Sequence, residues 1–203
     1  MTDTIRWDKV IREEPGSNWN TRSELVAHLI RPDDVVCDLG AGAQPLRRFL
    51  PSSVGYIPVD CVKVYPDTHV ADFNADFTLP DEPFNVITCL GLVAHLDDLS
   101  HFFGTLIRDH AGKFIIFDVD ARKRAAEAGQ PRRFRTYDEM VQYFSGHVRD
   151  MSLFAQIRNR YFFCGLLGSS DSTTIVQRRP VDEIISKNMS SLKYLRYRVV
   201  DNR

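Results

Sequence analysis

The sequence VVCDLGAGA (residues 35–43) joins a run of strand-forming apolar residues to a glycine-rich turn. Because Gly40 and Gly42 carry no Cβ, the backbone can turn sharply there and approach a ligand closely. By itself, the motif is better explained as a tight strand-to-helix turn that binds nothing. Its meaning depends on the acidic residues around it.

Asp38 precedes the first glycine by two positions. A carboxylate there suits a cationic amino-acid ligand better than a pyrophosphate, which binds at the N-terminus of a helix. The third glycine of a dinucleotide-binding turn would fall at Pro45. These two features disfavour a nucleotide-linked oxidoreductase.

Short β-rich runs alternate with helical segments along the chain, which is typical of an α/β domain with a parallel sheet. The predicted strands are residues 35–38, 55–60, 69–72, 84–90 and 113–118, and the predicted helices are residues 23–30, 96–108 and 138–144, the last capped by Thr136. Residues 148–157 and 161–167 are expected to form a closing antiparallel pair. Residues 172–177 are a candidate edge strand, and residues 181–200 a candidate terminal helix.

Two more carboxylates end successive predicted strands. Asp60 ends the second strand, at a spacing that lets an acidic side chain accept hydrogen bonds from both hydroxyls of a ribose. Asp72 ends the third strand, where it could accept from an adenine amino group beside a stacking Phe73. Each alone is explained as readily by a solvated strand end. Ligands of open α/β sheets bind beyond the carboxyl ends of the strands, so the three positions together predict one ligand site.

As an ordered set, residues 37–42 (CDLGAG), Asp60, residues 72–73 and residues 84–90 (FNVITCL) resemble the motifs of class I S-adenosylmethionine-dependent methyltransferases. The resemblance covers about residues 35–118. It implies an α/β, Rossmann-like, seven-stranded, mostly parallel sheet with helices on both faces and an antiparallel closing strand. A single domain is expected over residues 1–203, with an N-terminal helical segment (1–34), a core (35–178) and a C-terminal helical extension (179–203).

The resemblance also implies the cofactor and its site. S-adenosyl-L-methionine is the expected methyl donor, and S-adenosyl-L-homocysteine is the expected product. The methionine part lies near Asp38 and the turn, the ribose near Asp60, the adenine near Asp72, and Leu90 lies beside the cofactor after strand four. The complete set of expected cofactor-binding residues is Asp38, Gly40, Ala41, Gly42, Asp60, Cys61, Asp72, Phe73 and Leu90. Ala43 departs from the pattern, since many members of the family have a third glycine there.

The segment LGLVAHL (residues 90–96) resembles the family's strand-to-helix segment, which commonly ends in Glu-His. Metal-dependent relatives place carboxylates where this chain has Gly91 and Ala94, so no metal is expected. Methyl transfer is an in-line displacement that positioning alone can accelerate. A hydroxyl acceptor must also lose its proton, and His95 is the candidate general base. A histidine that merely packs or caps at a helix start explains His95 equally well.

Several other polar residues are weaker candidates for contacts with a substrate. Two could close over the pocket, two end the fifth predicted strand, and three lie in the closing pair: Trp19 and Arg22, Asp118 and Asp120, and Arg158, Arg160 and Tyr161. Packing or solvated turns account for them as readily.

The acceptor is suggested by a less specific resemblance. Residues 56–60 (YIPVD) and 70–75 (VADFNA) are similar to methyltransferases of bacterial polysaccharide assembly. O-methylation of a sugar or polysaccharide precursor is therefore the leading hypothesis. A small metabolite or natural product as acceptor is the first alternative, and a non-catalytic S-adenosylmethionine-binding scaffold is the second.

The composition limits the partners of the chain. With 26 basic and 27 acidic residues among 203, its net charge is −1, and nucleic acid or a membrane surface is not an expected partner. The four cysteines are widely spaced, which argues against a zinc site and a disulfide framework. No apolar run approaches a membrane span and the start is polar, so a cytoplasmic protein is expected.

Overall fold

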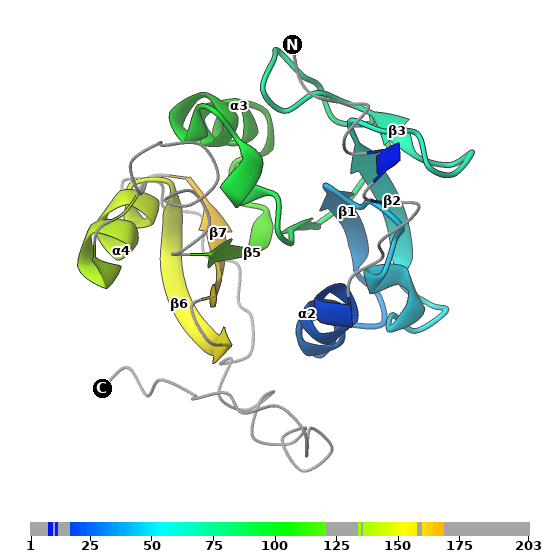
Figure 1. Cartoon of the computed structure of the whole chain (residues 1–203), viewed down its shortest axis with the longest axis horizontal. Coiled ribbons are helices and arrows are strands. Elements are labelled where there is room, and N and C mark those ends of the chain that lie inside the picture. Colours follow the sequence, from blue (N-terminus) through cyan, green and yellow to red (C-terminus); the bar gives the residue numbers. More distant parts are fainter. Residues whose placement is uncertain are drawn as a thin grey trace.

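The computed structural model of the chain describes residues 8–9, 11, 17–120, 134, 136–157 and 160–168. Within them, seven strands form one sheet in the order β3-β2-β1-β4-β5-β7-β6 (Figure 1). β1 to β5 pair in parallel, whereas β7 is antiparallel to both β5 and β6. The predicted fold class, with its closing antiparallel pair, is confirmed.

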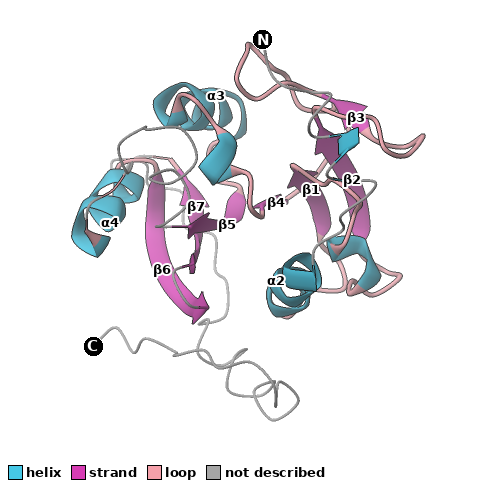
Figure 2. Cartoon of the chain, viewed as in Figure 1, coloured by secondary structure: helices cyan, strands magenta, loops and turns pink. Residues whose placement is uncertain are grey.

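The sheet and its helices are shown in Figure 2. The strands are β1 (Val35–Leu39), β2 (Gly55–Asp60), β3 (His69–Val70), β4 (Val86–Cys89), β5 (Phe114–Asp120), β6 (Val148–Ile157) and β7 (Arg160–Leu167). The helices are α2 (Ser17–Ala27), α3 (Leu99–His110) and α4 (Tyr137–Ser145), with two 3-10 helices, η1 (Leu46–Arg48) and η2 (Val93–His95).

Helices cover both faces of the sheet. Successive strand residues point to opposite faces, so neighbouring residues of β1 pack against different helices. On one face Val36 of β1 belongs to an apolar cluster with Val26 of α2. On the other face Cys37 of β1 belongs to a second cluster with Phe102 of α3 and Phe144 of α4. In Figure 1, α2 lies apart from α3 and α4, with strands between them.

Capping decides where the helices begin. α3 begins at Leu99 and not at the predicted Leu96, because the side chain of Asp98 accepts hydrogen bonds from the N–H groups of Ser100 and His101. α4 begins as predicted after Thr136, whose hydroxyl accepts from the N–H of Glu139.

The N-terminal helix differs from its prediction at both ends. α2 ends at Ala27, whereas apolar spacing predicts helix to residue 30. Leu29 and Ile30 lie in a turn and are still buried against the sheet. The spacing of apolar residues therefore reported burial correctly and the helix end wrongly.

The β2–β3–β4 portion is built without α-helices. β2 leads to β3 through residues 61–68, and β3 leads to β4 through residues 71–85. β3 is shorter than predicted, because only His69 and Val70 pair with β2. Val70 is 62% exposed at this edge of the sheet.

Some predicted elements lie outside the described residues, namely the candidate edge strand 172–177, the candidate helix 181–200 and most of residues 1–16. In the part of the chain that is described, no helix has both the length and the apolar character to cross a membrane.

Candidate functional site

The site lies where the strand order reverses. From β1, the strand order proceeds through β2 to β3 toward one edge of the sheet, and through β4 to β5 toward the other edge. β1 and β4 therefore flank a topological switch point. Each of these two strands is followed within two residues by a glycine with a left-handed backbone, Gly40 (φ 75°) after β1 and Gly91 (φ 80°) after β4. A Cβ on Gly40 would lie 3.2 Å from the Cβ of Leu92, so the two turns are in contact.

The turn after β1 is docked onto the end of β2. The N–H groups of Gly40 and Ala41 donate to the carbonyl of Val59 at 2.8 and 3.1 Å. The N–H of Gly42 donates to Oδ2 of Asp60 at 2.8 Å. Three successive donors are thus bonded within the chain, and the three-residue η1 follows the turn in place of an α-helix. A pyrophosphate site requires such donors and a helix N-terminus, so this geometry disfavours a dinucleotide.

Asp38 is buried beneath the turn, with 3% of its surface exposed. Its two oxygens accept hydrogen bonds from Tyr56 Oη on β2 at 2.5 Å and from Thr88 Oγ1 on β4 at 2.6 Å. Burial raises the pKa of Asp38 to about 6, although both hydroxyl groups oppose the shift. Sequence reasoning missed Tyr56 and Thr88. Both residues lie on the same face of the sheet as Asp38, which would have identified them. This shared face can be recognised only when the register of the parallel strands is known.

Asp60 ends β2 and is also buried. Its Oδ1 accepts from the N–H of Val62 at 3.0 Å, while Oδ2 holds Gly42. Burial raises the pKa of Asp60, opposed by these backbone donors. The neighbouring Cys61 is half-buried, and burial together with the charge of Asp60 raises the pKa of its thiol to about 12. Cys61 is therefore a neutral thiol near pH 7.

The loop after β3 is clamped to the segment that carries His95. Asp72 is half-buried and accepts from the N–H of Asn74 at 3.0 Å. The amide side chain of Asn74 donates to the carbonyl of His95 at 3.3 Å and accepts from the N–H of Asp97 at 2.7 Å. Asn74 thus connects Asp72, the predicted adenine contact, with the backbone around His95, the candidate base. The sequence did not predict this connection.

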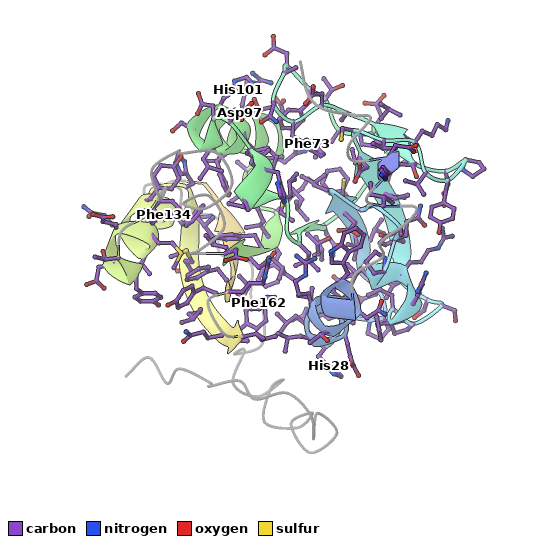
Figure 3. All side chains as sticks on the ribbon, viewed as in Figure 1. His28, Phe73, Asp97, His101, Phe134 and Phe162 are labelled. Carbon is purple, nitrogen blue, oxygen red and sulfur yellow. The ribbon has the colours of Figure 1, made fainter. Side chains whose placement is uncertain are left out.

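Phe73 lies in the hydrophobic core between α3 and the strands (Figure 3). Its ring is 4% exposed and packs edge-on against Phe77 and Phe102, with centroid distances of 5.2 and 5.8 Å. The ring therefore serves the core, and an adenine contact from Phe73 stays a prediction.

His95 closes η2 and is half-buried. Its backbone N–H donates to the carbonyl of Leu92 at 2.8 Å. The segment is thus fixed from two sides, by this bond and by Asn74, while the role of the imidazole stays a prediction.

An ionic network formed by the buried Arg22 and Asp118 and the half-buried Asp120 and Arg160 lies beside the turn after β4. Asp118 accepts hydrogen bonds from the N–H of Gly91 and from the guanidinium of Arg160. Arg160 also donates to Asp120 at 3.0 Å, and Nη1 of Arg22 lies 3.8 Å from Asp118. Burial lowers the pKa of Arg22, and the charge of Asp118 opposes the shift. Sequence reasoning placed Arg22, the pair Asp118 and Asp120, and Arg160 in three separate groups, and the fold brings them together.

The N-terminal helix reaches both glycine turns. A Cβ on Gly42 would lie 3.6 Å from the ring of Trp19 and 3.8 Å from Ile11, and a Cβ on Gly91 would lie 2.2 Å from Nη1 of Arg22. Trp19 and Arg22 are three residues apart on α2 and therefore share one face of the helix.

Two weaker candidates, Tyr161 and Arg158, remain. The ring of Tyr161 packs against Tyr137 of α4 with a centroid distance of 5.4 Å, and Arg158 lies outside the described residues. Within the described ranges, no group of three or more His, Cys, Asp or Glu side chains could hold a metal ion.

The strand order, the antiparallel β7 and the glycine turn at the switch point define the Rossmann-like fold of S-adenosylmethionine-dependent methyltransferases. No family model and no curated protein sequence matches the chain, whereas solved structures do.

Three solved structures illustrate this likeness, each with a TM-score of 0.56. The chain is similar to a methyltransferase of Aquifex aeolicus that depends on S-adenosylmethionine, at 12% identity over 83% of this chain and 100% of that one. It is similar to the N-methyltransferase NodS of Bradyrhizobium japonicum, solved with S-adenosylhomocysteine, at 9% identity over 83% and 100%.

The third is phosphoethanolamine N-methyltransferase 1 of Haemonchus contortus, solved with phosphoethanolamine and S-adenosylhomocysteine. The identity is 12%, and the match covers 94% of this chain. This chain spans only about half (52%) of the length of the Haemonchus protein. At these identities the likeness establishes the fold.

Proposed function

We propose that the chain is an S-adenosylmethionine-dependent methyltransferase. The observation that carries the proposal is the acidic series at the switch point, where Asp38, Asp60 and Asp72 lie at or just beyond the ends of β1, β2 and β3. A ligand with a sulfonium and an ammonium group is cationic in part, and carboxylates with raised pKa values gain most from such a neighbour. These carboxylates would repel a pyrophosphate.

The residues present fit this group. Asp38 would face the methionine ammonium, Asp60 would accept from the ribose hydroxyls, and Asp72 would accept from the adenine amino group. Each carboxylate oxygen can accept more than one hydrogen bond, so the bonds that Asp60 makes to Gly42 and Val62 leave capacity for a ribose. Leu90 would provide an apolar wall after β4.

S-adenosylmethionine supplies an electrophilic methyl group. The chain would hold the acceptor in line with it and remove the proton that a hydroxyl acceptor loses, with His95 as the base. Asn74 supports this role, because it fixes the backbone on both sides of Leu96, directly after His95.

For the acceptor we propose a sugar or polysaccharide precursor that is methylated on oxygen. The support is the similarity of residues 56–60 and 70–75 to polysaccharide-associated methyltransferases. A small metabolite is the second candidate, favoured by the phosphoethanolamine N-methyltransferase among the similar structures. The third candidate is a non-catalytic scaffold, in which the same site would bind S-adenosylmethionine without turnover.

The experiment is a transfer assay with methyl-labelled S-adenosylmethionine and two panels of acceptors, sugars and small amines, with and without EDTA. Label in a sugar in both conditions supports the proposal and its metal independence. Label in the amines only would replace the acceptor class. Cofactor binding without label in either panel would favour the scaffold, and activity that EDTA abolishes and a divalent ion restores would contradict metal independence.

A further inference from the structure

The turn after β4 is confined by a carboxylate on one side and a guanidinium on the other. Asp118, the fifth residue of β5, is 1% exposed and accepts the hydrogen bond of the Gly91 N–H. Arg22 is so near that a Cβ on Gly91 would lie 2.2 Å from its Nη1. With a φ of 80°, Gly91 adopts a backbone conformation that other residues rarely adopt. The hydrogen bond to Asp118 and the close approach of Arg22 both depend on a glycine at this position.

Both oxygens of Asp118 are engaged. Oδ1 accepts from Gly91, and Oδ2 faces Arg160 from β7 and Arg22 from α2. A buried carboxylate carries a large desolvation cost unless cations and hydrogen bonds compensate it, and two guanidinium groups do so here. Asp118 is therefore poorly placed to take a proton from an acceptor. Its geometry is that of an anchor.

The network is balanced in charge, since Arg22 and Arg160 match Asp118 and Asp120. It therefore adds no net charge beside the carboxylates that are proposed to bind the cofactor. It joins three distant parts of the chain, α2, the end of β5 and the start of β7, to one backbone N–H after β4.

We propose that Asp118 is a positioning residue for the cofactor site. It fixes the Leu90–Gly91 turn, which forms one wall of the site, and Arg22 and Arg160 hold its carboxylate in place. This inference rests on the proposed function, because the resemblance to methyltransferases is what places Leu90 beside the cofactor.

The test compares Asp118→Asn with Asp120→Asn in the full chain. Asp120 is the matched control, because it accepts from the same Arg160 whereas the N–H of Gly91 donates to Asp118. Two quantities are measured: the Gly91 amide in protein labelled with 15N-glycine, by chemical shift and hydrogen exchange, and the affinity for S-adenosylhomocysteine, by calorimetry. In Asp118→Asn we expect an upfield shift, faster exchange and an affinity loss of about tenfold or more, against less than about threefold in Asp120→Asn.

The outcomes separate the inference from the function it rests on. Wild-type protein that fails to bind S-adenosylhomocysteine contradicts the proposed function. Wild-type binding with an unchanged affinity in Asp118→Asn overturns the positioning role, even if the Gly91 amide moves. If Asp118→Asn does not fold, Arg160→Lys replaces it, because it keeps the charge and loses the guanidinium fork. A Gly91 amide and an affinity both unchanged in Arg160→Lys would likewise overturn the inference.

Discussion

Asp60 accepts a hydrogen bond from the backbone N–H of Gly42 at 2.8 Å, and this contact fastens the turn after β1 to the end of β2. One carboxylate thus shapes the glycine turn and, in the proposed site, also binds the ribose. A change at Asp60 should therefore affect both the turn and the affinity for the cofactor.

For Asp60→Ala we expect binding of S-adenosylhomocysteine to weaken about tenfold or more, since hydrogen bonds to a charged acceptor contribute about 1.5–3 kcal/mol. Calorimetry measures the change. Asp109→Ala is the control, because Asp109 lies near the end of α3 and pairs on the surface with its neighbour Arg108. A folded Asp60→Ala protein with wild-type affinity would remove Asp60 from the site.

The stability of the fold should fall with rising pH because of Asp38. Burial raises its pKa to about 6 in the folded state, above the ordinary value of about 3.9 in the unfolded state. The folded state thus binds the proton more tightly, and the resulting stabilisation is complete below about pH 3.9 and lost as the pH rises through about 6.

Asp38→Asn should remove the part of this dependence that Asp38 contributes, while Asp60, whose pKa is also raised by burial, keeps its own part. Its amide can accept from one hydroxyl and donate to the other, so Tyr56 and Thr88 keep partners. At pH 8 we expect the free energy of unfolding to rise by about 1–3 kcal/mol, measured by denaturant titration. A variant whose stability keeps the wild-type slope between pH 4 and pH 7 would show that Asp38 does not cause it.

Gly91 and Gly112 form a matched pair for substitution by alanine. Their φ angles are 80° and 81°, but a Cβ meets Arg22 at Gly91 and nothing within 4 Å at Gly112. Gly112→Ala should cost about 1–2 kcal/mol of stability for the left-handed backbone. Gly91→Ala should cost at least about 1 kcal/mol more, because Arg22 must move. Equal losses in chemical denaturation would mean that Arg22 does not confine the turn.

His95→Ala should slow methyl transfer to a hydroxyl acceptor by about a hundredfold to ten-thousandfold, the usual contribution of a general base. Affinity for S-adenosylhomocysteine should stay nearly unchanged. The wild-type rate should fall on the acidic side as the imidazole gains a proton. A near-normal rate with the same pH profile would assign His95 to packing, and weakened cofactor binding would make it a cofactor contact.

The strands and the first turn could be predicted because their signals are local. The apolar run of β1 and the glycines after it determine a strand and a turn within nine residues, 35–43. Helix ends were less accurate, since hydrogen bonds such as that of Asp98 decide them and the periodicity of apolar residues does not.

The contacts around the site depend on long-range register, which a single sequence does not reveal. Arg160 meets Asp118 only because β7 pairs antiparallel with β5, with Asp120 opposite Arg160. Asp38 was predicted as a ligand-facing carboxylate, yet its hydroxyl partners became visible only when β2 and β4 were placed on either side of β1. The position of Phe73 after the third predicted strand suggests a stacking contact with adenine. Packing against Phe102 of α3, which is distant in sequence, determines where its ring lies.

The most direct test of the account is calorimetric titration of the wild-type chain with S-adenosylhomocysteine and, separately, with NAD. We expect saturable binding of S-adenosylhomocysteine and no binding of NAD, because carboxylates and not free N–H donors line the switch point. Binding of NAD with no binding of S-adenosylhomocysteine would contradict it.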